Sequence, residues 1–116
     1  MNIEDYRTFC LELPASTEGF PFDAKTLVFK VAGKLFALTN VETFKSINLK
    51  CNPEKAIELR ELYESVLPGY HMSKKHWNTI RTDESLSDEL IFQWTKESYD
   101  LVVQSLTLKK RSEFNL

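Results

Sequence analysis

The chain has 116 residues, of which 42% are hydrophobic and 28% charged, and it contains three glycines and four prolines. This is the length and composition of one ordinary globular domain, which excludes a disordered chain, a fibrous protein and a chain of several domains. The formal net charge of −2 argues against a generic nucleic-acid binder, because such domains are usually basic overall.

The first predicted element is an amphipathic helix between Asn2 and Pro14. Apolar residues recur at spacings of three and four from Ile3 to Leu13, which is helical periodicity. Asn2 can cap the N-terminus of this helix, and Pro14 ends it because proline cannot donate to the helical hydrogen-bond ladder. We expect the next segment, Ala15–Asp23, to be an ordered loop.

Strand alternation follows from Thr26. Side chains alternate between the two faces with a period of two in Thr26–Val31 and in Ser46–Cys51, and Leu35–Thr39 is the return strand of a hairpin. The turn between the first two strands is supplied by Ala32-Gly33-Lys34. We expect these three strands to form an antiparallel meander.

A second helix is predicted from Pro53 to about Glu64, with Asn52 as its cap and proline at its first position. Pro68-Gly69 then leads into a polar segment, Tyr70–Arg81, that should end as another strand.

The last helix is expected to begin at Ser85 with Asp88 and to end near Leu106, before a basic tail, residues 107–116, that should fray. Together the elements predict an α+β fold over residues 1–106, an antiparallel sheet covered on one face by the N-terminal, middle and C-terminal helices.

We expect a cytoplasmic protein. The longest apolar runs, such as Leu35–Leu38, are far shorter than the roughly 20 residues that a membrane span needs. Acidic residues, Glu4 and Asp5, stand where a secretory signal would carry basic ones. The cysteines, Cys10 and Cys51, should then be reduced and act as small buried side chains.

The small net charge hides a segregation of charge along the chain. Ala24–Lys50 contains five basic residues and one acid, and His71–Thr82 contains three basic residues and no acid. Asp83–Leu106 contains one basic residue and six acids. The predicted strands are thus basic and the helices acidic, so the face of the sheet left open by the helices should attract a polyanion. Exposed lysines that merely keep strand edges soluble would give the same pattern.

The most distinctive segment is Tyr70–Arg81. It combines cations, two histidines, two aromatic rings and small polar side chains without a carboxylate, a composition that suits contacts with phosphates. Tyr70 or Trp77 could stack on an unpaired base. Trp77 could equally be anchored in the core.

No metal or catalytic site is predicted. His71 and His76 are five residues apart, which does not place two ligands on one helix face, and neither cysteine completes a zinc motif with them. The chain has no nucleophile elbow and no glycine-rich phosphate loop. We therefore expect a protein without a cofactor that is not an enzyme.

Several segments, in order along the chain, match the pattern of one known family: Cys10–Pro14, Glu18–Phe22, Leu27–Val31, Lys34–Ala37, Ser46–Cys51, Pro68–Thr79 and Ser98–Val102. Together they resemble the MmcQ/YjbR family from about Asn2 to Leu106. The resemblance implies a small bacterial-type cytosolic protein with a CyaY-like fold, also described as a double-wing arrangement, that binds DNA. The site positions that it implies are Asn48, Lys50, His71, Lys74, Lys75, His76, Trp77 and Asn78.

Our leading hypothesis is a monomeric DNA-binding domain. In it Lys30, Lys50, Lys74, Lys75 and Arg81 contact the DNA backbone, whereas Asn48, His76 and Asn78 read or position bases. The alternative is that the same cluster of donors binds a small anionic ligand or an acidic loop of a protein partner.

Overall fold

The computed structural model describes residues 1–83 and 85–116. Glu84, one of the six acids counted in Asp83–Leu106, lies outside the described residues. In chain order the elements are α1 (Ile3–Glu12), β1 (Ser16–Gly19), β2 (Thr26–Val31), β3 (Lys34–Asn40), β4 (Ser46–Lys50), α2 (Pro53–Leu62), β5 (Val66–Pro68), β6 (Trp77–Arg81), α3 (Asp88–Ser105) and α4 (Leu108–Glu113).

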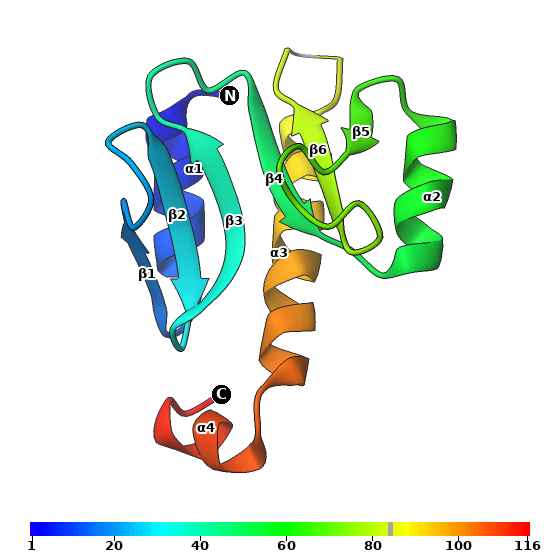
Figure 1. The fold of residues 1–116 in the computed structure, drawn as a ribbon. Coiled ribbons are helices and arrows are strands. Elements are labelled where there is room, and N and C mark those ends of the chain that lie inside the picture. The colour runs from blue at the N-terminus through cyan, green and yellow to red at the C-terminus, as the bar shows by residue number, and fades with distance from the viewer. Residues whose placement is uncertain (84) are drawn as a thin grey trace.

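The strands form one antiparallel sheet in the order β1-β2-β3-β4-β6-β5. Figure 1 shows α1 and α3 behind the sheet, with α2 beside β5 and β6. The helices thus leave the other face of the sheet open, and the predicted α+β fold and the predicted meander of β2, β3 and β4 are confirmed. Within the described ranges, no helix is long and apolar enough to cross a bilayer.

The structure corrects two predicted loops. Ala15–Asp23 contains β1, which pairs with β2 along Ser16–Gly19. Before the connection at Pro68-Gly69 lies β5, which ends at Pro68 and pairs with β6. Both strands lie at edges of the sheet, where a short strand with few apolar residues is sufficient because it has only one neighbour.

The ends of the chain's later helices also differ from the prediction. α2 ends at Leu62. α3 begins at Asp88 because the side chain of Ser87, rather than that of Ser85, accepts a hydrogen bond from the Leu90 N–H and so caps the helix. The tail expected to fray contains α4, whose Arg111 Nε donates to the Val103 carbonyl oxygen at 3.0 Å.

The β2–β3 hairpin turns within two residues. Ala32 and Gly33 have φ values of 48° and 83°, so both central residues are left-handed, as in the hairpin turns whose twist matches that of the flanking strands. The turn is one residue shorter than predicted, and β3 therefore begins at Lys34.

The core lies between the sheet and α1 and α3. The Tyr6 hydroxyl of α1 and the Thr95 hydroxyl of α3 are hydrogen bonded at 2.9 Å, and the Tyr6 ring packs edge-on against Phe29 of β2. The ladder between β2 and β3 shifts register after Phe29. This bulge lets consecutive residues of β3 face the core: Ala37 pairs with Phe29, and the Phe36 ring packs on Tyr99.

A side chain of α3 joins β3 to β4. The direct ladder between these strands covers only Ala37–Thr39 of β3. Beyond it, the buried Ser98 hydroxyl donates to the Phe36 carbonyl oxygen at 2.6 Å and accepts from the Lys50 N–H at 2.9 Å. One hydroxyl thus satisfies two main-chain groups where the strands diverge.

Candidate nucleic-acid interface

The open face is the surface of the sheet that the helices leave uncovered. In β4 the buried residues Ile47 and Leu49 face the helices, so their neighbours face the opposite way. The registers of β4 and β6 and the alternation in β2 place these predicted site residues on the open face: Lys30, Asn48, Lys50, Trp77 and Arg81.

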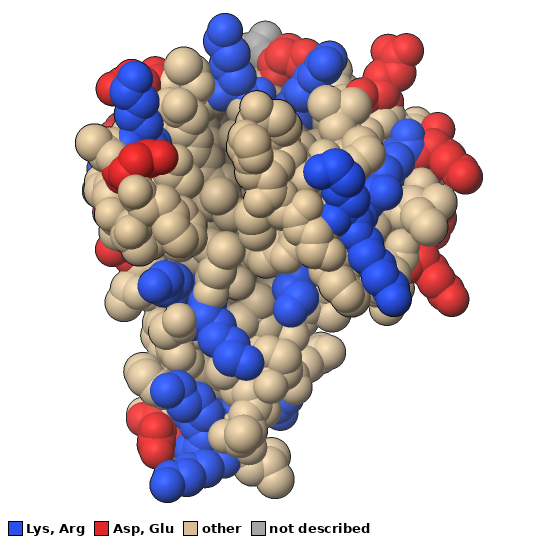
Figure 2. Space-filling model, viewed as in Figure 1, with Lys and Arg blue, Asp and Glu red and all other residues tan. Residues whose placement is uncertain are grey.

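The open face is basic. Figure 2, viewed from this side, shows Lys and Arg spread around an uncharged centre, with most Asp and Glu at the margins. Among the described residues, no carboxylate lies within ion-pair distance of Lys30 or Lys50. Both lysines are half-buried.

A single carboxylate occurs in the six strands, that of Glu18 in β1. Glu18 pairs in register with Phe29, a core residue, and so faces the helices. There its carboxylate accepts from Arg7 of α1 at 2.8 Å and 2.7 Å. The Arg7 guanidinium lowers the pKa of Glu18 below its ordinary value. Glu18 is therefore on the face opposite the open face, where Arg7 neutralises its charge.

Two hollows lie on the open face. One, of about 540 Å³, lies over β4, β5 and β6, and Lys45, Ser46 and Arg81 line it. The other, of about 350 Å³, lies over β1 and β2, where Lys30 lines it beside Phe20. Each half of the sheet thus presents a depression with at least one basic side chain at its edge.

The Gly69–His76 loop is tied to the open face by a network of three residues. The Thr79 hydroxyl accepts from the Tyr70 N–H at 2.9 Å and donates to the Asn48 side-chain oxygen at 2.6 Å. The Asn48 amide then donates to the Tyr70 carbonyl oxygen at 3.1 Å. Both polar atoms of the Asn48 side chain are occupied, so Asn48 positions the loop instead of presenting free groups to a ligand. The Tyr70 ring remains 68% exposed and lies 4.0 Å from the His71 ring.

The remaining predicted residues of the loop are exposed: His71, Lys74, Lys75 and His76. The Lys74 ammonium donates to the Gly69 carbonyl oxygen at 3.1 Å and so closes the loop on itself. Trp77, at the end of the loop, is half-buried and pairs in register with Lys50. It is neither a core anchor nor a fully exposed stacking surface.

Asn78 is not part of the interface, which corrects the prediction. Its side chain is 1% exposed and faces the helices, because it pairs in register with Leu49. The amide donates to the Ala56 carbonyl oxygen at 3.3 Å and accepts from Arg60 Nε at 2.7 Å. Asn78 therefore joins β6 to α2 and has no free group for a base.

Arg60 of α2 is a supporting residue that sequence reasoning missed. Besides bonding Asn78, its guanidinium donates to the Lys74 carbonyl oxygen and, at 3.5 Å, to the Trp77 carbonyl oxygen. A helix residue thus holds both ends of the basic part of the loop. No sequence signal marks this role, since an arginine near a helix end is ordinarily solvated.

A cleft of about 290 Å³, which no sequence pattern indicates, lies on the opposite face between α2 and α3. Of the described residues, no three His, Cys, Asp or Glu side chains are grouped so that they could hold a metal ion.

An open antiparallel sheet with helices on one face and a basic surface on the other defines a small α+β sheet protein. The chain belongs to the YjbR family, whose model matches residues 11–101.

Relatives and solved structures agree with this assignment. The chain is 38% identical over 104 residues to the uncharacterized protein YbdF of Escherichia coli O157:H7, covering 89% of this chain and 85% of YbdF. It is 34% identical over 112 residues to the uncharacterized protein YjbR of Escherichia coli K12, covering 96% of this chain and 95% of YjbR.

Among solved structures, the Deinococcus radiodurans protein DR2400, which contains a DUF419 domain, has a TM-score of 0.94 at 40% identity, covering 99% of this chain and 88% of that one. A Pseudomonas syringae protein with a TM-score of 0.75 at 23% identity covers 87% of this chain and 98% of its own, and shares the fold. The comparisons establish the family and the fold, and DNA binding stays a prediction.

Proposed function

We propose that this protein is a non-enzymatic, monomeric DNA-binding domain that contacts DNA through its open face. The observation that carries the proposal is the distribution of charge in the sheet. The open face presents Lys30, Lys50 and Arg81, whereas Glu18, the one acid in the strands, is paired with Arg7 on the other face. A phosphate backbone would meet cations there without a strand carboxylate to repel it.

The proposed contacts divide by chemistry. Lys30, Lys50 and Arg81 neutralise phosphates, and Lys75 adds a further phosphate contact from the Gly69–His76 loop. Tyr70 stacks on a base that is unpaired or splayed out, because its exposed ring is held in place through the bonds of its main chain to Asn48 and Thr79. Single-stranded DNA would use both kinds of contact, whereas an intact duplex would use the phosphate contacts alone.

Fluorescence anisotropy with labelled single-stranded and duplex DNA, titrated between about 50 and 200 mM salt, tests the proposal. The test variant is the triple substitution Lys30→Gln, Lys50→Gln and Arg81→Gln. Because three cations no longer neutralise phosphates in this variant, the slope of log affinity against log salt should flatten by roughly 2 to 3 units.

The matched control carries the same change in net charge on the helices: Lys96→Gln, Lys109→Gln and Lys110→Gln. It should bind nearly as well as the wild type, because α3 lies behind the sheet and α4 lies below the ends of its strands (Figure 1). Equal loss in both variants, or wild-type binding no tighter than that of the triple variant, would overturn the proposal.

The larger hollow favours one alternative, a small anionic ligand held by Lys45 and Arg81. Inorganic phosphate and citrate serve as probes in thermal unfolding. If either raises Tm in the wild type but not in Arg81→Gln, and DNA does not bind, the small-ligand function replaces the DNA function.

A further inference from the structure

The smaller hollow of the open face, about 350 Å³ over β1 and β2, is lined in part by the segment Glu18–Phe22. This segment is one of those that match the family pattern, and the contacts proposed above make no use of it. Gly19, Phe20, Val28 and Lys30 are among the residues that line the hollow. We name it the β1–β2 hollow.

Gly19 is the residue that keeps the hollow open. It ends β1 and pairs in register with Val28. Nothing lies within 4 Å of a Cβ atom built at Gly19, and its φ is not positive. Neither crowding nor backbone conformation therefore calls for glycine here, although glycine weakens a strand. The missing side chain provides space, and a glycine within a strand often marks a place where a ligand approaches closely.

The free surface beside this space is aromatic. Phe20, the residue after Gly19, is 48% exposed. Val28 also lines the hollow, but it is 1% exposed and so contributes almost no surface to a ligand. The apolar contact that the hollow can offer is therefore the Phe20 ring.

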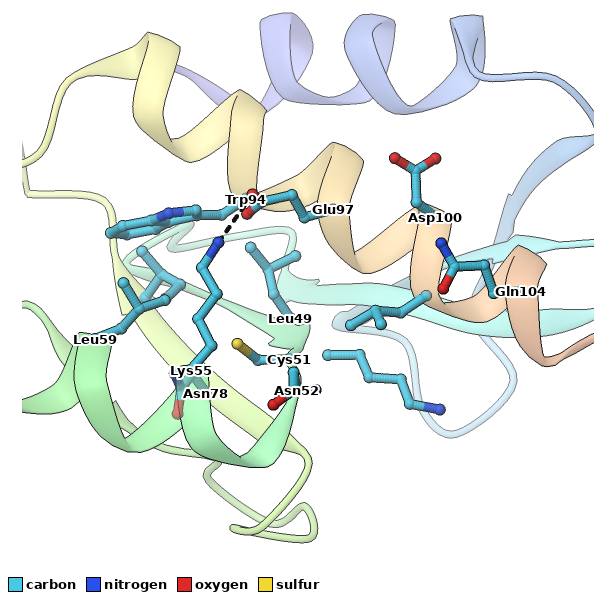
Figure 3. Close-up of a pocket in the computed structure, with 13 residues that line it drawn as sticks. Leu49, Cys51, Asn52, Lys55, Leu59, Asn78, Trp94, Glu97, Asp100 and Gln104 are labelled. Atoms are coloured by element: carbon cyan, nitrogen blue, oxygen red, sulfur yellow. Dashed lines mark hydrogen bonds and ion pairs between the residues drawn. The ribbon is translucent and has the colours of Figure 1, made fainter.

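The cation of the hollow has no acidic partner. Among the described residues, no carboxylate lies within ion-pair distance of Lys30. Glu18 also lines the hollow, but Arg7 binds its carboxylate. The cleft on the other face differs in this respect, because the Lys55 ammonium lies 3.0 Å from the Glu97 carboxylate (Figure 3). An aromatic ring beside an unpaired cation is complementary to a base beside its phosphate.

The loop that carries Phe20 is held at both ends. On one side, β1 pairs with β2 as far as Gly19. On the other side, the Asp23 carboxylate accepts from the Lys25 and Thr26 N–H groups at 2.8 Å and 2.7 Å. An exposed ring on an anchored loop loses little conformational freedom when a ligand covers it.

The β1–β2 hollow and the Tyr70 loop lie on one row of the open face. The residues directly opposite one another along this row, from β1 to β6, are Gly19, Val28, Leu38, Asn48 and Thr79. The main chain of Tyr70 is hydrogen bonded to the last two of them. Neighbouring strands lie about 4.8 Å apart, so the row is about 19 Å long. Because stacked nucleotides rise about 3.4 Å each, a single strand of about six nucleotides spans it.

We propose that the β1–β2 hollow holds one base of a single DNA strand. The base stacks on the Phe20 ring in the space that Gly19 leaves, and the adjoining phosphate pairs with Lys30. Tyr70 holds a second base of the same strand at the other end of the row. This inference rests on the DNA-binding function proposed above and adds the form of DNA that fits the open face, since the bases of an intact duplex are stacked on one another and do not reach the ring.

Fluorescence anisotropy at one salt concentration tests the base contact. The probes are oligothymidine of about eight nucleotides, an abasic strand of the same length and charge, and a duplex. Phe20→Ala should weaken binding of oligothymidine about fivefold or more, the effect of losing one stacked base, and leave the abasic strand and the duplex unchanged. Phe22→Ala is the matched control, because it removes an exposed ring of the same loop that does not line the hollow. It should bind all three probes as the wild type does.

A second pair of variants tests the space. Gly19→Ala leaves most of the hollow open and should bind oligothymidine nearly as well as the wild type. Gly19→Ile fills it with a side chain that suits a strand, and should weaken oligothymidine as much as Phe20→Ala does. Thermal unfolding checks that each variant is folded.

The outcomes separate this inference from the proposed function. The base subsite is overturned, and the DNA function stands, if the wild type binds DNA with the expected salt dependence but Phe20→Ala binds oligothymidine as well as Phe22→Ala does. Equal affinity of the wild type for oligothymidine and the abasic strand, or an equal loss of duplex binding in Phe20→Ala, has the same meaning. A wild type that binds neither oligothymidine nor duplex overturns both.

Discussion

Asn48 and Asn78 are neighbours across β4 and β6, yet they do opposite things. Asn48 pairs in register with Thr79 and lies on the open face, whereas Asn78 pairs with Leu49 and faces the helices. Each has both polar atoms of its amide occupied. Asn48 binds the loop that presents Tyr70. Asn78 binds Arg60, which donates to the same loop from the helix side of the sheet.

Gly69 is required by a close approach of two main chains. A Cβ atom at this position would lie 2.8 Å from the Trp77 Cβ and 2.9 Å from the Trp77 carbonyl oxygen. The Gly69 N–H donates to that same oxygen at 2.9 Å, so the chain cannot move away without losing the bond. The start of the Gly69–His76 loop is thereby fixed against β6.

We predict that Gly69→Ala lowers the free energy of unfolding by about 1–3 kcal/mol, because the added methyl group meets main-chain atoms that cannot yield. Urea denaturation measures the loss. Gly19→Ala is the matched control, since nothing lies within 4 Å of a Cβ built there. Similar losses in the two variants would contradict this account of Gly69.

At the scale of elements, α2 supports the open face although it lies on the other side of the sheet. Arg60 reaches past β6 to the carbonyl oxygens of Lys74 and Trp77. The other anchors of the loop between these residues are its own turn bonds, such as the Trp77 N–H to the Ser73 carbonyl oxygen at 2.9 Å, the Lys74 bond to Gly69, and the bond from the Cys51 N–H to the His76 carbonyl oxygen at 2.8 Å.

We predict that Arg60→Ala accelerates hydrogen exchange of the amides in residues 69–77 at least several-fold, while the amides of β2 and β3 keep their protection. Exchange followed by mass spectrometry or NMR makes the measurement. Glu58→Ala, an exposed position on the same helix, should leave the loop unchanged. Unaltered exchange in Arg60→Ala would mean that the turn bonds and the contacts of the loop with the sheet, such as those of Tyr70 with Asn48 and Thr79, hold the loop without Arg60.

The elements that sequence patterns predicted are those with a buried face. α1, α2 and α3 repeat apolar residues at helical spacing, and β2 and β4 alternate them, because each packs against the core. α4 has no buried residue and is held by the Thr107 cap and by Arg111. β1 and β5 are short edge strands, and β5 ends in a proline. Such elements depend on neighbours distant in sequence, which a local pattern does not contain.

The candidate site was predictable in part for the same reason. The count of charges located the basic strands, and alternation placed Lys30, Asn48 and Lys50 on the open face, whereas the position of Arg81 on that face comes from its pairing with Ser46. Asn78 could also have been placed correctly, because it has the same parity as Ile80, an obvious core residue of the same strand. The cleft between α2 and α3 could not be predicted, since it depends on where two helices stand apart.

At the scale of the whole molecule, charge is separated between the two faces, and the stability of the fold depends on part of that separation. The ion pair of Arg7 and Glu18 joins α1 to β1. The pKa of Glu18 is lowered mainly by its hydrogen bond to Arg7. Because the folded state favours the ionised carboxylate, this pair stabilises the protein above the pKa of the unfolded chain, and the contribution is lost as pH falls through the folded pKa.

We predict that Glu18→Gln is less stable than the wild type at pH 7 and that the difference disappears as the pH falls below about 4.3, the ordinary pKa of glutamate. Urea denaturation at a series of pH values gives both curves. Hydrogen bonds from Lys25 and Ser85 lower the pKa values of Asp23 and Asp83. The free energy of unfolding therefore falls at acid pH in both proteins, whatever residue occupies position 18. A difference that stays constant from pH 7 to pH 3 would contradict the assignment to ionised Glu18.

The hydroxyl of Ser98 gives the sheet a property that its strand order does not show. Where β3 and β4 diverge, the rung between Phe36 and Lys50 is completed by a helix side chain and not by the facing strand. The two halves of the sheet therefore meet at an angle that α3 sets. Any shift of α3 along its axis changes the curvature of the open face, so the shape of that surface depends on a helix that lies on the opposite side of the sheet.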